Sequence, residues 1–158
     1  MVVYLNESLS SDINDTLSQT AVFYEHMLKW KHWENLHYGQ DRSWPGSIFR
    51  SIKNIITFKI SKNIKGGINA DLYRKGYLVG VKKASKRKND KGEIITINIK
   101  KMDSDQLFKT DGFNTLDKIL DMEFVKAWLI KEAKSDKAEE YVIEKYNNYK
   151  KQLEEEGY

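Results

Sequence analysis

The sequence predicts a mainly helical bundle, and three observations support this fold class. Apolar residues recur at helical spacing over roughly 13–36 and again after Pro45. A broad apolar face follows Thr115, and a charged segment with a thin apolar stripe covers about 136–155. The 158 residues suffice for one core, so we expect a single domain over 1–158.

The first helix is expected over roughly 13–36, capped within Ser10–Asp12 or Asn14–Asp15, because residues 1–15 are polar and weakly patterned. The second opens at Ser43-Trp44-Pro45, where serine can cap and proline suits a first turn. Its apolar face consists of Ile48, Ile52, Ile55 and Ile56. Gly66-Gly67 is expected to end this segment.

The segment 69–101 allows two interpretations. In the first, Asn69 caps a helix that runs to about Arg87, and a row of small residues lets another helix approach closely; the row is Gly76, Gly80 and Ala84. In the second, 77–81 is a strand, 89–92 is a turn and 93–100 is the returning strand, so that the fold is α+β with a hairpin over 77–100. We favour the helix for 69–87, with a short β-hairpin or an insertion around 88–110.

Two further helices are expected in the last third of the chain. Asn114 or Thr115 caps one, whose apolar face reaches Trp128 and Ile130. The other is the charged helix over 136–158, which we place at the periphery of the domain. Its apolar stripe consists of Tyr141, Ile143, Tyr146, Tyr149 and Leu153.

Positive charge is concentrated in the middle of the chain. Residues 49–101 carry 15 basic and 3 acidic side chains, whereas both flanking segments are net acidic. Basic side chains that neutralise phosphates release counterions, so we expect nucleic-acid binding through this region. The candidate contacts are Arg74, Lys75, Lys82, Lys83, Lys86, Arg87, Lys88 and Lys91. Lysine dominates this set, which favours phosphate contact over base reading and hence binding without sequence specificity.

Two other function classes are alternatives. The tyrosine-rich stripe of the last helix is typical of a surface that docks on protein, as in an adaptor, an inhibitor, an anti-defence protein of a virus or plasmid, or a homodimer. A metal-dependent nuclease needs clustered carboxylates near a lysine, and the central segment offers only Asp71, Asp90 and Glu93. The three histidines lack the spacing of a helical zinc site. We therefore expect a binding protein rather than an enzyme, with no metal and no cofactor.

Four stretches, in this order, resemble the motifs of a known family. They are His26-Met27-Leu28-Lys29-Trp30, Ser43-Trp44-Pro45-Gly46-Ser47-Ile48, Tyr73-Arg74-Lys75-Gly76-Tyr77 and Thr115-Leu116-Asp117-Lys118-Ile119-Leu120-Asp121. Over roughly 16–130 the chain resembles the prokaryotic domain of unknown function 29 family. The resemblance implies a mainly helical fold and no particular reaction. The family motif falls on His26, Lys29, Trp30, Ser43, Trp44 and Ser47, which caps and core packing also explain.

The location of the protein is constrained by what the sequence lacks. There is no cysteine and no run of apolar residues long enough for a bilayer span. The first residues do not have the pattern of a secretory signal. We therefore expect a cytoplasmic protein that does not bind membranes.

Overall fold

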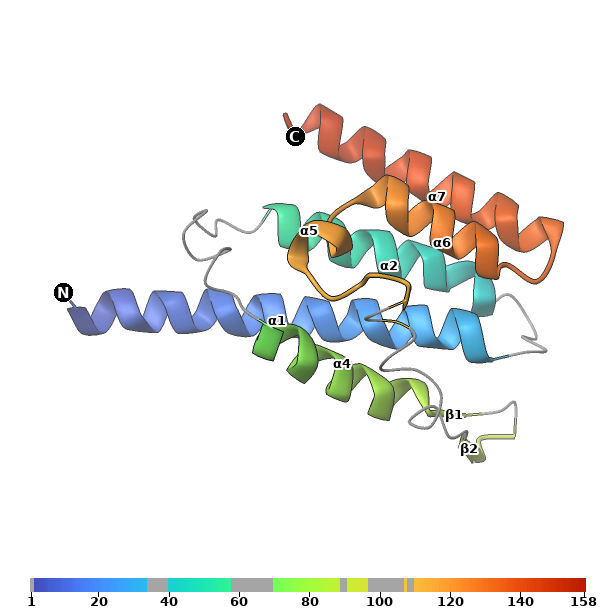
Figure 1. The fold of residues 1–158 in the computed structure, drawn as a ribbon, viewed down its shortest axis with the longest axis horizontal. Helices are drawn as coiled ribbons and strands as arrows, with labels where there is room; N and C mark the ends of the chain where they lie inside the picture. Colours follow the sequence, from blue (N-terminus) through green and yellow to red (C-terminus); the bar gives the residue numbers. More distant parts are fainter. Residues whose placement is uncertain (1, 34–39, 58–69, 89–90, 97–106, 108–109) are drawn as a thin grey trace.

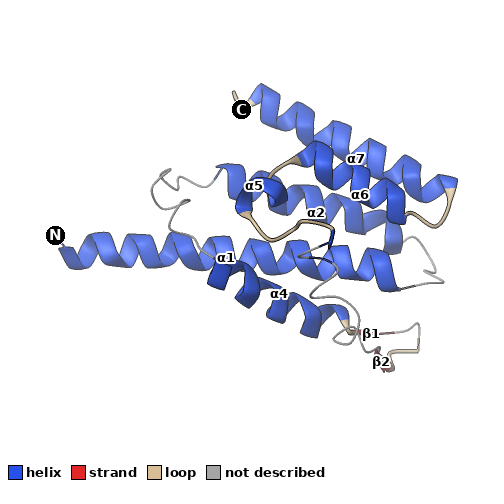
Figure 2. Ribbon diagram, viewed as in Figure 1, coloured by secondary structure: helices blue, strands red, loops and turns tan. Residues whose placement is uncertain are grey.

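A computed structural model describes residues 2–33, 40–57, 70–88, 91–96, 107 and 110–158 (Figure 1). Among the described residues, Figure 2 shows mostly helices, with strands only in a hairpin after the third labelled helix, which confirms the predicted mainly helical bundle. In chain order the elements are α1 (Val2–His32), α2 (Gln40–Thr57), α4 (Ala70–Ala84), β1 (Lys86–Lys88), β2 (Ile94–Thr96), α5 (Leu116–Ile119), α6 (Met122–Glu132) and α7 (Asp136–Glu155).

Helix α1 lies at the centre of the molecule. Figure 1 shows α4 and the hairpin on one side of α1, with α2 on the other side and α6 and α7 beyond it. The core forms where α1 meets α4, α2, α6 and the segment before α5. It includes Phe23, Tyr24, Met27, Leu28, Ile48, Phe49, Ile52, Phe113 and Leu129. Because α4 packs mainly on α1, the face of α4 that points away from α1 is left to solvent.

The boundaries of α1 differ from the prediction. The helix begins at Val2, so residues 10–15 lie inside it and the expected cap there is wrong. No glycine or proline interrupts this stretch, so nothing in it stops a helix. At the other end, Lys134 Nζ donates to the carbonyl oxygens of Trp30 and Lys31 at 3.0 and 2.9 Å, which satisfies acceptors that a helix end leaves free.

Helix α2 begins at Gln40, three positions before the predicted cap. Ser43 therefore lies within the helix, and Pro45 occupies its interior rather than its first turn. The predicted apolar face is confirmed for Ile48, Ile52 and Ile55, none of which has exposed surface.

For the segment 69–101, the structure combines parts of the predicted helix and of the predicted hairpin. Residues 77–81 belong to α4, so the strand proposed there is wrong. The helix ends at Ala84 rather than near Arg87, and β1 pairs antiparallel with β2, Arg87 lying opposite Ile95. The expected turn is present: Gly92 has φ +78°, a left-handed conformation that glycine adopts without strain. The hairpin thus forms within the predicted region, but its first strand follows α4 instead of replacing it.

The helix predicted after Thr115 is divided in two. Thr115 Oγ1 accepts from Lys118 N at 3.3 Å and so caps α5, as expected. Asp121 then caps α6, its carboxylate accepting from Phe124 N at 3.1 Å. The first backbone N–H groups of a helix have no carbonyl partner within the helix, and an aspartate side chain can accept a hydrogen bond from one of them. Asp121 therefore allows a new helix to begin here, directly after α5.

Helix α7 has the predicted bounds, and Ser135 caps it by accepting from Ala138 N at 3.1 Å. Its apolar stripe agrees with the predicted one at Tyr146, Tyr149 and Leu153, but Val142 is fully buried in place of Ile143, which is 45% exposed. Tyr146 lies in the core, and the Tyr149 hydroxyl accepts from Arg50 Nε at 3.1 Å. The tyrosines that suggested a protein-docking surface are thus largely used within the molecule.

Several predicted features lie outside the described residues, namely Gly66-Gly67, the Asn69 cap and 97–100. In the part of the chain that is described, no helix is long and apolar enough to cross a bilayer.

Candidate nucleic-acid interface

Helix α4 divides cleanly into a buried and an exposed face. The residues facing α1 recur at helical spacing and are Gly76, Tyr77, Gly80, Val81 and Ala84. The opposite face carries exposed Lys75, Leu78, Val79, Lys82 and Lys83. The sequence of α4 therefore directs three lysines outward because its small and apolar residues are needed against α1.

The row of small residues predicted in α4 is confirmed as the contact with α1. A Cβ atom placed on Gly80 would lie 2.9 Å from both Glu25 N and Tyr24 Cβ. On Gly76 it would lie 2.7 Å from Thr20 Cγ2. The two helices approach so closely that the α4 backbone packs directly on α1, which fixes the orientation of the outer face.

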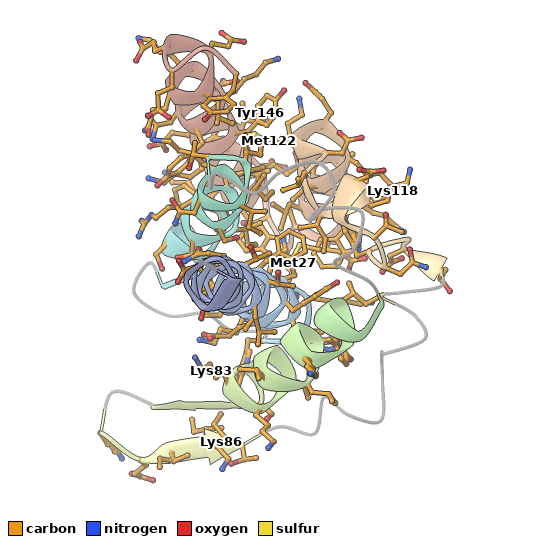
Figure 3. The ribbon with its side chains drawn as sticks, turned by 90° about the vertical axis from the view of Figure 1, so that its left-hand side faces the viewer. Met27, Lys83, Lys86, Lys118, Met122 and Tyr146 are labelled. Carbon is orange, nitrogen blue, oxygen red and sulfur yellow. The ribbon has the colours of Figure 1, made fainter. Side chains whose placement is uncertain are left out.

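The hairpin extends the same exposed surface. Lys86 in β1 and Lys91 in the turn are exposed, as is every described residue of 91–96. Figure 3 shows Lys83 and Lys86 on the side of α1 where α4 and the hairpin lie, away from Met27 in the core and from Lys118 and Tyr146. We call the exposed side chains of Lys75, Lys82, Lys83, Lys86 and Lys91 the basic face.

Some lysines of the helical body form ion pairs, whereas four lysines of the basic face form none in the described part of the chain. In the body, Lys29 Nζ lies 2.7 Å from Glu25, Lys53 Nζ lies 3.1 Å from Glu156, and further lysines form ion pairs between or along helices. Within the described part of the chain, no ion pair involves Lys75, Lys82, Lys83 or Lys86. Their charge is thus directed to solvent instead of being offset locally.

The structure places some, but not all, of the eight predicted nucleic-acid contacts on one exposed face. Five of them form the basic face. Arg74 lies in α4 and Arg87 and Lys88 in β1, but their side chains are outside the described part. Sequence reasoning missed that apolar side chains lie among these lysines: Leu78 is 48% exposed and Ile94 67% exposed. The signal was available for Leu78, because helical spacing places it opposite the glycines.

The residues of the family motif lie elsewhere, at the contact of α1 with α2 and α6. Trp30 Nε1 donates to Leu129 O at 2.9 Å, and Trp44 is buried beneath Lys29, whose Nζ lies 5.9 Å from the ring centre. Ser47 is half-buried and Ser43 exposed. These contacts hold helices together, as core packing predicted, and none of these residues belongs to the basic face.

His26, the histidine of this motif, is largely buried between α1 and α2. Its Nδ1 donates to Val22 O at 2.8 Å, and its Nε2 lies 3.8 Å from Glu25 Oε2. Burial lowers the pKa of His26 below its ordinary value of 6.5, and the nearby Lys29 and Arg50 cations act in the same direction. The imidazole is therefore neutral at pH 7 and acts as a hydrogen-bond donor within the helix.

Two polar clusters outside the basic face join elements of the fold. The Asp111 carboxylate, 5% exposed, accepts from Trp128 Nε1 at 3.1 Å and lies 3.9 Å from Lys31 Nζ. Glu123 accepts from the Tyr146 hydroxyl, and this hydrogen bond lowers the pKa of that carboxyl group. In the described residues, no three histidine, aspartate or glutamate side chains are grouped to hold a metal ion.

Comparison with known proteins adds no relatives. No protein-family model matches the chain, and no curated protein or solved structure is significantly similar to it. The resemblance to the domain of unknown function 29 family therefore stays a prediction.

Proposed function

We propose that this protein binds nucleic acid without strong sequence preference, through the basic face on α4 and the hairpin. The observation that carries the proposal is the group of exposed lysines on one side of the molecule, of which Lys75, Lys82, Lys83 and Lys86 form no ion pair within the described part of the chain. Each lysine that reaches a phosphate releases condensed counterions, which supplies affinity that does not depend on base sequence.

The chemistry of the side chains supports contact with the backbone rather than the bases. Lysine presents a point charge on a flexible stem, whereas bidentate recognition of guanine needs the planar fork of arginine. Lys75 and Lys82 are two helical turns apart on α4, and Lys86 and Lys91 continue the row along the hairpin. A row of point charges fits a line of phosphates, on DNA or RNA alike.

A salt titration with matched variants tests the proposal. Fluorescence anisotropy of labelled duplex DNA and single-stranded RNA would be measured at several salt concentrations. Wild-type protein would be compared with K82Q/K83Q/K86Q and with K131Q/K137Q/K151Q, which removes the same charge from exposed lysines of α6 and α7. For the first variant we expect the slope of log K against log salt to become shallower by about 0.9 per lost phosphate contact on duplex DNA.

The control variant distinguishes a local site from general attraction. It should keep the wild-type salt slope if binding uses the basic face. Equal weakening by both variants would show that net charge alone attracts the ligand. Absence of binding at low salt to either nucleic acid would contradict the proposal outright.

A further inference from the structure

The outer face of α4 carries two exposed aliphatic side chains between its lysines. Leu78 is 48% and Val79 40% exposed, and we call them the apolar pair. Exposed Lys75 lies one helical turn before the pair, and exposed Lys82 and Lys83 lie one turn after it, so the five residues share one face. At about 1.5 Å per residue, Lys75 and Lys82 are about 10 Å apart along the helix axis. A polyanion that reaches the lysines on both sides therefore covers the apolar pair.

The group that covers the apolar pair decides whether this contact stabilises a complex. A duplex turns its phosphates and sugars outward and keeps the apolar faces of its bases stacked inside. Phosphate pressed against aliphatic side chains loses hydration without gaining a hydrogen bond in return. A single strand, in contrast, can turn unstacked bases toward the protein while its phosphates stay on the lysines. Contact of the base faces with the apolar pair then removes apolar surface from water.

We infer that the preferred ligand of the basic face is single-stranded nucleic acid, bound with bases over the apolar pair and phosphates on the lysines around it. The inference rests on the proposed nucleic-acid binding and adds the strand state and the part of the ligand that meets Leu78 and Val79. Charge complementarity selects a polyanion for this face, and the apolar pair selects the polyanion whose bases are accessible. A duplex binds through the lysines alone and hence more weakly. An anionic bilayer also combines charge with apolar groups, but two aliphatic side chains offer it little area to insert.

The lysines and the apolar pair have different effects on the salt dependence of binding. Each phosphate contact adds about 0.7 to the steepness of log K against log salt on single strands. Contact between apolar groups releases no counterion, so it shifts the whole line without changing its slope. Loss of the apolar pair should therefore weaken binding by the same factor at every salt concentration, and only for a ligand with accessible bases.

Anisotropy titrations with three labelled probes test this: a single-stranded DNA, the same DNA as a duplex, and a strand of equal length that has phosphates and sugars but no bases. The variant is L78A/V79A, because alanine removes apolar surface and keeps the helix. We expect it to bind the single strand about 5-fold more weakly at every salt concentration, with an unchanged slope. It should bind the duplex and the strand without bases as wild type does.

I143A is the matched control, because Ile143 is 45% exposed but lies on α7, and it should leave all three affinities unchanged. Equal wild-type affinity for the single strand and for the strand without bases would overturn the inference and leave the proposed nucleic-acid binding in place. An equal loss from L78A/V79A on the duplex would do the same.

Two further outcomes separate this inference from its alternatives. Absence of binding to all three probes would contradict the proposed function itself. Vesicles containing phosphatidylserine present anionic headgroups on an apolar interior. Co-sedimentation with these vesicles that depends on Leu78 and Val79, while L78A/V79A keeps wild-type affinity for the single strand, would assign the apolar pair to a lipid surface and overturn the inference.

Discussion

Two glycines in different helices show how the space around a single residue affects the stability of this fold. Gly80 allows α4 to lie against the α1 backbone, whereas Gly46 in α2 faces only Lys145, with a Cβ position 3.4 Å from Lys145 Cδ. The same substitution is therefore expected to have opposite effects at the two positions.

G80A should destabilise the protein, and G46A should stabilise it. Alanine favours a helix over glycine by about 1 kcal/mol, but at position 80 its Cβ would push α4 from α1, so we expect a net loss of about 1–2 kcal/mol. At position 46 a flexible lysine side chain can move, so the gain of up to about 1 kcal/mol is kept. Urea denaturation measures both. Equal effects of the two variants would contradict the close helix contact.

His26 should make stability depend on pH. The unfolded chain takes up a proton near 6.5, whereas the folded protein holds the pKa of His26 lower. Stability from the neutral imidazole is therefore present above 6.5 and is lost as the pH falls toward the folded pKa. The groups facing the ring are Glu25 and Lys29 of α1 and Arg50 of α2.

Replacing His26 by asparagine removes the titrating group but keeps an amide near the position of Nδ1. Denaturation of wild type and H26N would be followed between about pH 5 and 7.5, where histidine is the main titrating side chain. We expect wild-type stability to fall more steeply than that of H26N on acidification. Parallel curves would show that His26 is equally basic in both states.

At the scale of elements, α7 shows that a charged helix can belong to the core. Its buried residues are Ala138, Val142, Tyr146 and Leu153, and they pack on α2 and α6. Substitutions at two adjacent residues, Val142 and Ile143, can test which face of α7 packs against the rest of the protein.

V142A should destabilise the protein by about 2 kcal/mol, because it removes two methyl groups from a fully buried site and leaves a cavity. I143A should change the free energy of unfolding by less than about 0.5 kcal/mol, since Ile143 is largely exposed. Thermal or urea denaturation compares the two. A larger loss from I143A would mean that the predicted stripe, rather than the observed one, faces the body.

At the scale of the whole molecule, stability should be unevenly distributed. Helix α1 from residue 16 is packed against α2 and α4, whereas the hairpin has exposed residues throughout its described part. Among the described elements, we expect backbone amides of β1 and β2 to exchange hydrogen fastest and those of the buried part of α1 slowest. Exchange measured by mass spectrometry on peptides from 16–33 and 84–96 tests this, and slower exchange in the hairpin peptide would contradict it.

Much of the fold was determined locally. The apolar spacing of Ile48, Ile52 and Ile55 predicted the buried face of α2, and the charged segment with its thin apolar stripe predicted the bounds of α7. The glycine row of α4 predicted a close helix contact. These predictions hold because helical periodicity and the absence of a Cβ atom are properties of the residues themselves and of their near neighbours in the sequence.

Tertiary structure decided where the elements meet and which charges stay free. Helix α7 buries Val142 rather than Ile143 because its inner face is set by its packing on α2 and α6, which are distant in the chain. The middle of the sequence is basic by composition alone. The packing of Gly76 and Gly80 on α1, with the hairpin following Ala84, places Lys82, Lys83 and Lys86 on one side of the molecule. Helical spacing alone gives the two faces of α4 but does not specify which helix covers the glycine row.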